Sequence, residues 1–306
     1  MKKILFFITL FAYGLNAQEA HVLFNRVNMS IYNPAFTVNQ ETSILLFSRS
    51  QWTNIKDAPR ANYILYNLPE KKNVNIGFTV QNDRVFIEQK TNLTVDYNYK
   101  VKISETDNLF LGIKGGGFYN KINLDQLERL TSMANPALAP IKNYFTPVLG
   151  IGMQYKAPNY FLGVGMPSLF NNKRYKDTRD WETYAADQTY IYLSGGAFLS
   201  LNRNFNLIPV ITYRAISDNP NLFSMNFEIE YKERFSFGYG VSNNSFGGIF
   251  ITSKGIKGIE LGYGYEFINS KKVKAIRSGS HELMLRFLLT SKKDKSIIRE
   301  EGINEK

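Results

Sequence analysis

The sequence has no cysteine, and its 306 residues include only two histidines, His21 and His281, and two tryptophans. The lack of cysteine excludes disulfide frameworks, cysteine-ligated zinc, iron–sulfur clusters and thiol nucleophiles. Two histidines also argue against a multi-histidine metal site. The mean hydropathy is −0.25. A helical protein with several membrane spans, each needing about 20 apolar residues, is therefore excluded.

Aromatic residues and positive charge are what the chain has in quantity. Aromatics make up 14% of the residues, with 19 tyrosines and 23 phenylalanines, and the formal net charge is +11. A polar average does not exclude a membrane-spanning β-barrel, because the residues of its strands alternate between lipid and lumen. Composition therefore leaves two classes, a soluble β-rich protein and an outer-membrane barrel.

The first seventeen residues read as a secretory signal peptide. Lys2 and Lys3 form a basic start, the apolar stretch 4–15 follows, and Ala17 supplies a small residue before the expected cleavage site. The apolar stretch is too short to span a bilayer comfortably, so we expect removal on export rather than an uncleaved anchor. Loss of the two lysines lowers the charge of the mature chain from +11 to +9. An exported chain without cysteine fits a Gram-negative envelope.

Strict alternation of apolar and polar residues is the main pattern of the remaining chain. In the stretch 91–103, the polar residues Thr94, Asp96 and Asn98 alternate with apolar side chains. The apolar positions are Leu93, Val95, Tyr97, Tyr99, Val101 and Ile103. Period two over this length is the signature of a β-strand with two different faces.

About fourteen such segments follow one another, each about as long as a tilted strand that crosses a bilayer. They begin near residues 43, 60, 73, 91, 108, 145, 159, 189, 205, 222, 234, 245, 257 and 279. Connections after even-numbered segments are mostly short, whereas several after odd-numbered ones are long, above all 120–144 and 167–188. This parity is typical of a monomeric outer-membrane β-barrel, here over 43–290, rather than of the alternative, a soluble β-sandwich or solenoid.

The polar face of the segments is expected to line a wet lumen. It carries Asp96, Lys100, Glu228, Glu230 and Glu260, while the opposite face meets lipid. Glycines within the segments are interpreted as barrel geometry that relaxes twist or admits neighbouring side chains, rather than as ligand contacts. They include Gly115, Gly116, Gly117, Gly247, Gly248, Gly262 and Gly264.

Catalytic and cofactor motifs are missing from the sequence. There is no nucleophile elbow, P-loop, dinucleotide fingerprint or HExxH. Glu228 and Glu230 share a face, but a polar lumen explains them better than an acid/base pair does. The acidic residues of 167–188 lack the spacing of a calcium loop. We therefore expect neither an enzyme nor a cofactor.

The positive charge does not indicate a nucleic-acid partner, because it is spread over turns and the tail instead of forming one basic stripe. The tail 291–306 has mixed charge and no alternation, and is expected in the periplasm. The segment 18–42, before the first alternating stretch, is likewise expected in the periplasm.

Several short motifs resemble one known family. In chain order they are Asn33-Pro34-Ala35-Phe36, Arg49-Ser50-Gln51-Trp52 with Ala58-Pro59 after it, the stretch 75–83 ending in Asn82-Asp83, the stretch 160–169, and Gly279-Ser280-His281-Glu282. Their order and spacing resemble the PorP/SprF family of type IX secretion system membrane proteins over nearly the whole mature chain. Phe36-Thr37-Val38 departs from the family's usual aromatic-Ala-Gly after the Asn-Pro-Ala motif, which predicts a looser turn.

This resemblance implies an outer-membrane barrel without catalytic activity that works with the type IX machinery. The partners it implies are outer-membrane lipid, periplasmic components of that system, and an exported surface protein, such as a gliding adhesin, held through its C-terminal domain. Partner contacts are expected in 120–144, 167–188 or 18–42, because loops on a rigid barrel carry function. Two other readings stay open: a porin or hydrophobic-solute transporter, and a structural barrel that seats a periplasmic ring protein.

Strand periodicity assigns directions to the motif residues. Arg49 and Gln51 share one face and are expected inside the barrel, whereas Trp52 points the other way and is expected at the membrane interface. Asn33-Pro34 is expected to form a turn that seats the N-terminal segment.

The last alternating segment places its two polar motif residues on opposite faces. The phase of Leu283, Leu285 and Phe287 predicts His281 on the lipid side and Glu282 inward. For all the motif residues, closure of the fold and docking of an N-terminal plug are favoured over direct partner contact.

Overall fold

The computed structural model describes residues 22–36, 42–123, 143–170, 172–173, 186–187, 189–216, 221–243, 246–268 and 279–289. The predicted signal peptide 1–17 and the tail 291–306 lie outside the described residues, as does most of the long connections 120–144 and 167–188. No helix among the described residues is long and apolar enough to cross a membrane.

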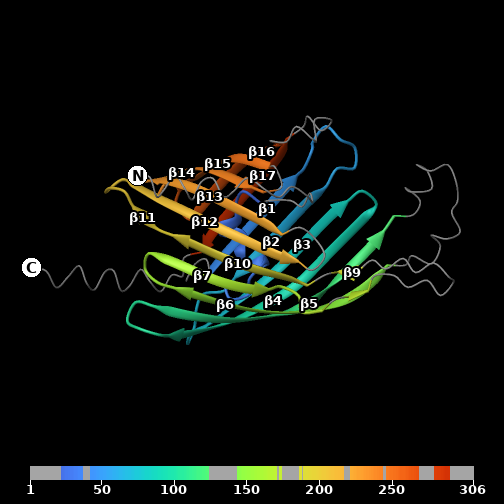
Figure 1. The fold of residues 1–306 in the computed structure, drawn as a ribbon, viewed down its shortest axis with the longest axis horizontal. Helices are drawn as coiled ribbons and strands as arrows, with labels where there is room; N and C mark the ends of the chain where they lie inside the picture. The colour runs from blue at the N-terminus through green and yellow to red at the C-terminus, as the bar shows by residue number, and fades with distance from the viewer. Residues whose placement is uncertain are drawn as a thin grey trace, which may run out of the picture.

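Fourteen long strands of the described residues form one antiparallel sheet (Figure 1). They are β1 (Thr42–Ser50), β2 (Arg60–Asn67), β3 (Val74–Val85), β4 (Glu88–Lys102), β5 (Asn108–Ile122), β6 (Tyr144–Lys156), β7 (Tyr160–Met166), β10 (Tyr190–Ala197), β12 (Phe205–Ile216), β13 (Leu222–Tyr231), β14 (Phe235–Ser242), β15 (Phe246–Ile256), β16 (Ile259–Ile268) and β17 (Ser280–Leu289). The short β11 (Leu199–Ser200) continues beside β12, and β8 (Asn172–Lys173) pairs with β9 (Ala186–Asp187) in a separate ribbon.

The sheet closes on itself. Each long strand pairs with the next one in sequence, β10 pairs with β12, and the first strand β1 pairs with the last strand β17. Figure 1 shows the blue β1 beside the red β17. Closure leaves no unpaired sheet edge, which is the condition for crossing hydrocarbon. The predicted fold class and strand positions are confirmed; the largest shift is in β4, expected from residue 91 and beginning at Glu88.

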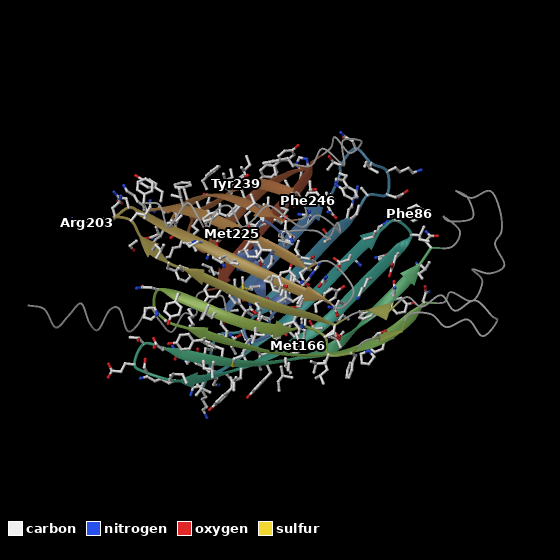
Figure 2. All side chains as sticks on the ribbon, viewed as in Figure 1. Phe86, Met166, Arg203, Met225, Tyr239 and Phe246 are labelled. Carbon is white, nitrogen blue, oxygen red and sulfur yellow. The ribbon has the colours of Figure 1, made fainter. Side chains whose placement is uncertain are left out.

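Burial along the strands follows the predicted alternation. On β4, Thr94 and Asp96 are 4% and 3% exposed, whereas their neighbours Leu93 and Val95 are 56% and 42% exposed. The same outward apolar face recurs around the barrel at Ile113, Ile151, Leu193, Ile229, Phe237, Ile251 and Leu283. A water-soluble protein does not expose a continuous apolar surface of this extent, so the outer face contacts lipid. Figure 2 shows side chains, among them the labelled Tyr239, projecting from the ribbon.

The two ends of the barrel differ in their connections. One end, called here the turn end, carries the connections after β2, β4, β6, β11, β13 and β15. The shortest of these connections has two residues, 257–258, and the longest has six, 68–73. The other end, the loop end, carries the long connections that follow β5 and β7. The parity is incomplete, since β3 and β4 are joined at the loop end by Phe86 and Ile87 alone. Figure 2 labels Phe86 at the loop end and Arg203 at the turn end.

Residues 22–36 lie inside the barrel and form a plug. They comprise α2 (Asn25–Asn28), the 3₁₀ turn η2 (Met29–Ile31) and a terminal turn, and most of their side chains are buried. The expectation that 18–42 lies in the periplasm is therefore wrong for 22–36. The segment has no period-two pattern, and it is not part of the sheet, as predicted. Its apolar residues pack against the inner wall of the barrel rather than lying in the periplasm.

Candidate functional site: the plug and its dock in the lumen

The plug has little regular structure of its own, so its fixed position depends on the barrel wall. Within it, the backbone N–H groups of Val27 and Asn28 both donate to the carbonyl of Phe24, at 3.2 and 3.3 Å. Asn33 N–H donates to the Met29 carbonyl at 2.9 Å. A helix of four residues is not stable alone in water. Side chains from the wall therefore have to hold it.

The apolar head of the plug, Leu23 and Phe24, packs into a cluster with the inner wall. The Phe24 ring meets Phe250 edge-on, with ring centroids 5.2 Å apart, and Phe47 at 6.4 Å. The cluster also contains Val22, Val27, Leu45, Tyr63, Leu65 and Met284. Burying Leu23 and Phe24 contributes about 1.5–3 kcal/mol each relative to leaving them in water.

A buried ion triad fixes the start of the plug. The Leu23 N–H donates to both carboxylate oxygens of Glu282, at 3.1 and 3.0 Å. Arg49 on β1 donates to Glu282 on the neighbouring β17. It also donates to Glu266 on β16, at 2.6 Å. The side chains of Arg49, Glu266 and Glu282 are at most 2% exposed. Because these charges are sealed from water, removing one partner leaves the others buried and uncompensated.

A second ion pair reaches from the plug to the opposite part of the wall. The Arg26 guanidinium makes two hydrogen bonds to Glu228 on β13, at 3.0 and 3.1 Å. Burial alone would lower the pKa of Arg26, but the charge and hydrogen bonds of Glu228 outweigh it, and the pKa of Arg26 is raised. The plug therefore stays positively charged at this point, opposite a lumen carboxylate.

Further hydrogen bonds tie the plug backbone to the wall. Lys114 on β5 donates to the Ser30 carbonyl at 3.2 Å and pairs with Asp96 at 2.8 Å. On β13, Asn226 donates to the Leu23 carbonyl at 2.7 Å. These contacts satisfy backbone groups that the short helix leaves unpaired.

The Asn33-Pro34-Ala35 motif forms the tight turn that ends the plug. The Asn33 side chain accepts from Ala35 N–H at 2.9 Å and donates to the Met153 carbonyl on β6 at 3.1 Å, so one residue both builds the turn and docks it. Phe36 then packs edge-on against Phe161 at the turn end of β7. The predicted seating turn is confirmed. The stretch Phe36-Thr37-Val38, which departs from the family's usual sequence, extends into residues outside the described ones, so the looser turn stays a prediction.

The wall accommodates this turn with glycines. A Cβ atom on Gly112, Gly152 or Gly165 would overlap Asn33, Pro34 or Ala35, while Gly262 and Gly264 give the same room to Phe24. The interpretation that strand glycines admit neighbouring side chains is right for these positions, and the neighbour is the plug. Gly115 is different, since a Cβ there meets nothing within 4 Å.

Two small cavities lie where the plug meets the wall between β10 and β16. They measure about 20 and 30 Å³. The first lies between the Phe24 side of the plug and Glu228, and the second between Tyr32 and Arg214. Each has room for one or two water molecules. Burial raises the pKa of Tyr32, which stacks on Tyr192 with ring centroids 4.7 Å apart, so this phenol stays neutral.

The other motif residues divide between the wall and the loop end. His281 lies outward as predicted, where its Nδ1 is 2.8 Å from the Tyr263 hydroxyl. Strand β1 ends at Ser50, so the alternation that assigned directions to Gln51 and Trp52 does not reach them. Gln51 donates its N–H to the Pro59 carbonyl at 3.0 Å, and Trp52 has a φ of 44° in the turn between them.

Asn82 and Asp83 lie toward the loop end of β3, away from the plug dock. The Asn82 amide donates to Thr91 on β4 at 2.8 Å, and Asp83 accepts from Gln81. Sequence reasoning missed Leu23, Arg26 and the inward glycines of β5, β6 and β7 that meet the Asn33-Pro34-Ala35 turn. Glycine at alternate, inward positions of β6, β7 and β16 was the available signal.

The charged groups of the site hold the plug against the wall. These charges are paired with one another, and among the described residues no group of three histidine, aspartate or glutamate side chains has the geometry to hold a metal ion.

Comparison with solved structures shows the same kind of fold. A FadL homologue of Pseudomonas aeruginosa has a TM-score of 0.51 at 9% identity, covering 88% of this chain and 95% of that one. The monoaromatic hydrocarbon channel CymD has a TM-score of 0.48 at 10% identity, covering 91% and 96%. Omp33 of Acinetobacter baumannii has 0.46 at 8%, covering 82% and 99%. At these identities the likeness concerns the fold alone.

The family assignment rests on the sequence of nearly the whole chain. No curated protein matches it. A family model described as type IX secretion system membrane protein PorP/SprF matches residues 16–287, which include the plug, the ion triad and all fourteen long strands up to Phe287. The chain belongs to the PorP/SprF family of type IX secretion system membrane proteins.

Proposed function

We propose that this barrel is an outer-membrane component or accessory of the type IX secretion system that supports export or surface attachment of a cognate protein by binding its C-terminal domain. The observation that carries the proposal is a family match spanning plug and barrel together. In this proposal the turn end faces the periplasm and the loop end faces outward, as short turns and long loops do in outer-membrane barrels.

The plug favours a partner-binding role for the barrel rather than the role of an open pore. Residues 22–36 are held by the Glu282 triad, by Arg26–Glu228 and by Lys114, so the lumen side of the wall is already occupied by the chain itself. Surfaces left for a partner are the two rims. We place the C-terminal domain at the loop end, which β4 and β5, the longest strands with 15 residues each, both reach, and where β5 leads to a connection that lies largely outside the described residues.

A binding and export experiment tests this proposal. The purified barrel in detergent should retain an exported surface protein encoded beside it, and should lose it when the C-terminal domain of that protein is removed. A strain lacking the barrel should accumulate the same protein inside the cell. Retention that does not depend on the C-terminal domain, together with normal surface display in the deletion strain, would contradict the proposal.

Solute transport is the second candidate function. It is favoured by the names of similar solved barrels, which include a monoaromatic hydrocarbon channel and the toluene transporter TodX of Pseudomonas putida, though their likeness concerns the fold alone. Transport requires the plug to leave or rearrange. Uptake of a labelled aromatic hydrocarbon into vesicles that contain the barrel, above the rate for empty vesicles, would support this candidate over the first.

A further inference from the structure

Two turns at the loop end hold aromatic residues in a backbone conformation that favours glycine. Trp52 has a φ of 44° in the connection between β1 and β2, and Phe86 has a φ of 56° in the turn between β3 and β4. Large side chains rarely occupy this left-handed region, because the Cβ atom crowds the backbone. The other non-glycine residues with positive φ in the described part of the chain are all polar or charged. The two aromatic residues are therefore unfavourable choices for the local backbone.

An ion pair joins these two turns. Arg84, at the end of β3, donates to Asp57 in the β1–β2 connection at 3.2 Å. Three apolar side chains next to this pair are exposed: Ile55 by 41%, Val85 by 54% and Phe86 by 41%. Figure 2 shows Phe86 at the outer end of the β3–β4 hairpin. The three residues Ile55, Val85 and Phe86 are called here the tip patch.

The tip patch lies above the hydrocarbon of the membrane. Along β3 the outward positions change from Phe78 and Val80 to Asn82 and then to Arg84. This change from apolar to polar residues marks the boundary of the hydrocarbon near Asn82. Phe86 is four residues further along, which places it about 10 Å higher at a rise of about 3.3 Å per residue and a strand tilt of about 40°. Acyl chains do not reach this height, so lipid tails do not account for the exposed apolar residues.

The exposed charges beside the tip patch are basic. Lys56, Arg60 and Arg84 are exposed. The acidic residues of the same segments, Asp57 and Glu88, are only partly exposed, and Asp57 is already paired with Arg84. Arg60 and Arg84 lie directly opposite each other on β2 and β3, where like charges repel. An exposed apolar patch with basic residues around it fits a protein surface that is apolar at its centre and acidic at its rim.

We propose that the tip patch binds an acidic face of the C-terminal domain of the exported protein, with the Phe86 ring as the apolar anchor. This inference rests on the proposed function and names the surface that carries it. Packing within the barrel does not account for an exposed ring on an unfavourable backbone, whereas strained backbone and exposed aromatic anchors are both typical of binding sites.

Two substitutions to glycine test the anchor. Biolayer interferometry measures the affinity of the barrel in detergent for the C-terminal domain of the exported protein encoded beside it, and denaturant titration measures stability. Phe86→Gly suits the left-handed backbone, so stability should stay equal or rise, yet affinity should fall at least about tenfold because the ring is lost. Asn73→Gly makes the same kind of change at the turn end, where φ is 65°, and should leave the affinity unchanged. Unchanged affinity or lower stability of Phe86→Gly would refute the anchor, since lower stability would mean that Phe86 acts in the fold.

Charge reversal tests the acidic face. Lys56→Glu should lower the affinity about tenfold, and added salt should weaken binding by the wild type. Lys257→Glu reverses an exposed lysine at the turn end and should bind as the wild type does. Wild-type affinity in Lys56→Glu, with heat-modifiable gel mobility showing it folded, would overturn this inference and leave the proposed function standing. Failure of the wild-type barrel to bind the domain would overturn both.

Discussion

Arg49 is the residue on which the closure of the barrel and the docking of the plug converge. It pairs across the β1–β17 seam with Glu282, which in turn accepts the Leu23 N–H of the plug. Period two alone places Arg49 and Glu282 inward, as predicted from the sequence. It does not select Glu266 as the other partner, because that contact depends on the stagger of β16 against the seam.

Replacing Arg49 should destabilise the whole barrel. Arg49→Met leaves Glu266 and Glu282 buried without their cation, and we expect a loss of about 3–5 kcal/mol in the free energy of unfolding. Denaturant titration of the barrel in lipid vesicles measures it. Arg60→Met removes an exposed arginine at the start of the next strand and should change stability by less than about 0.5 kcal/mol. Similar losses for both variants would contradict the role of the triad.

The plug is the element that the motif residues predicted to dock on the barrel, although the segment 18–42 as a whole was assigned to the periplasm. Its Asn-Pro-Ala motif predicts a turn, and the structure contains it, yet the turn's partners are glycines on three strands far along the chain. A strand glycine is ambiguous in sequence, because relief of twist, a bulge and a close approach all require the same missing side chain. Only the closed barrel brings Gly112, Gly152 and Gly165 to one patch.

A matched pair of glycine substitutions should distinguish a glycine that makes room for the plug from one that does not contact it. The chain has no cysteine, so Ser30→Cys, at a plug position 5% exposed, gives one thiol that a water-soluble maleimide reaches only when the plug moves. Adding Gly112→Val should speed labelling at least about tenfold, because its Cβ overlaps Ala35 and the plug cannot seat.

The control is a glycine on the same strand. Gly115→Val adds a side chain that meets nothing within 4 Å of its Cβ and should leave the labelling rate of Ser30→Cys unchanged. Acceleration by both substitutions would mean that any perturbation of β5 releases the plug. Acceleration by neither would mean that the turn can dock without the space at Gly112.

The wall next to the plug head is also unusual as an element. On β4 the inward face is polar, but on β1, β2 and β17 the inward residues Phe47, Tyr63 and Met284 are apolar, like the lipid-facing residues of the same strands. Alternation detects such strands less well, since both faces carry hydrophobic residues. The plug head replaces lumen water there, which explains why these strands tolerate an apolar interior.

For the whole molecule, the number of strands decides whether the wall can fill its own interior. About eight strands enclose a lumen that side chains can fill, whereas 16–18 leave a water channel. The described residues form a barrel of fourteen, which lies between these limits and needs an insert to be closed. Alternating periodicity predicted the strands and the closure. Periodicity could not predict the insert, because nothing in the segment 22–36 repeats and its partners are spread from β1 to β17; docking of an N-terminal plug was expected from the motif residues instead.

Removing the insert should therefore convert the barrel from a closed to a conducting one. In planar bilayers the wild type should show little steady conductance, since residues 22–36 fill the lumen side of the wall. Deletion of 22–36 should give steady open channels, and Arg26→Ala should give brief openings because the bonds to Glu228 are lost. Lys121→Ala, a change at an exposed position on β5, should behave as wild type. Steady conductance in the wild type, or none in a deletion variant whose heat-modifiable mobility shows it folded, would mean that the plug does not control the lumen.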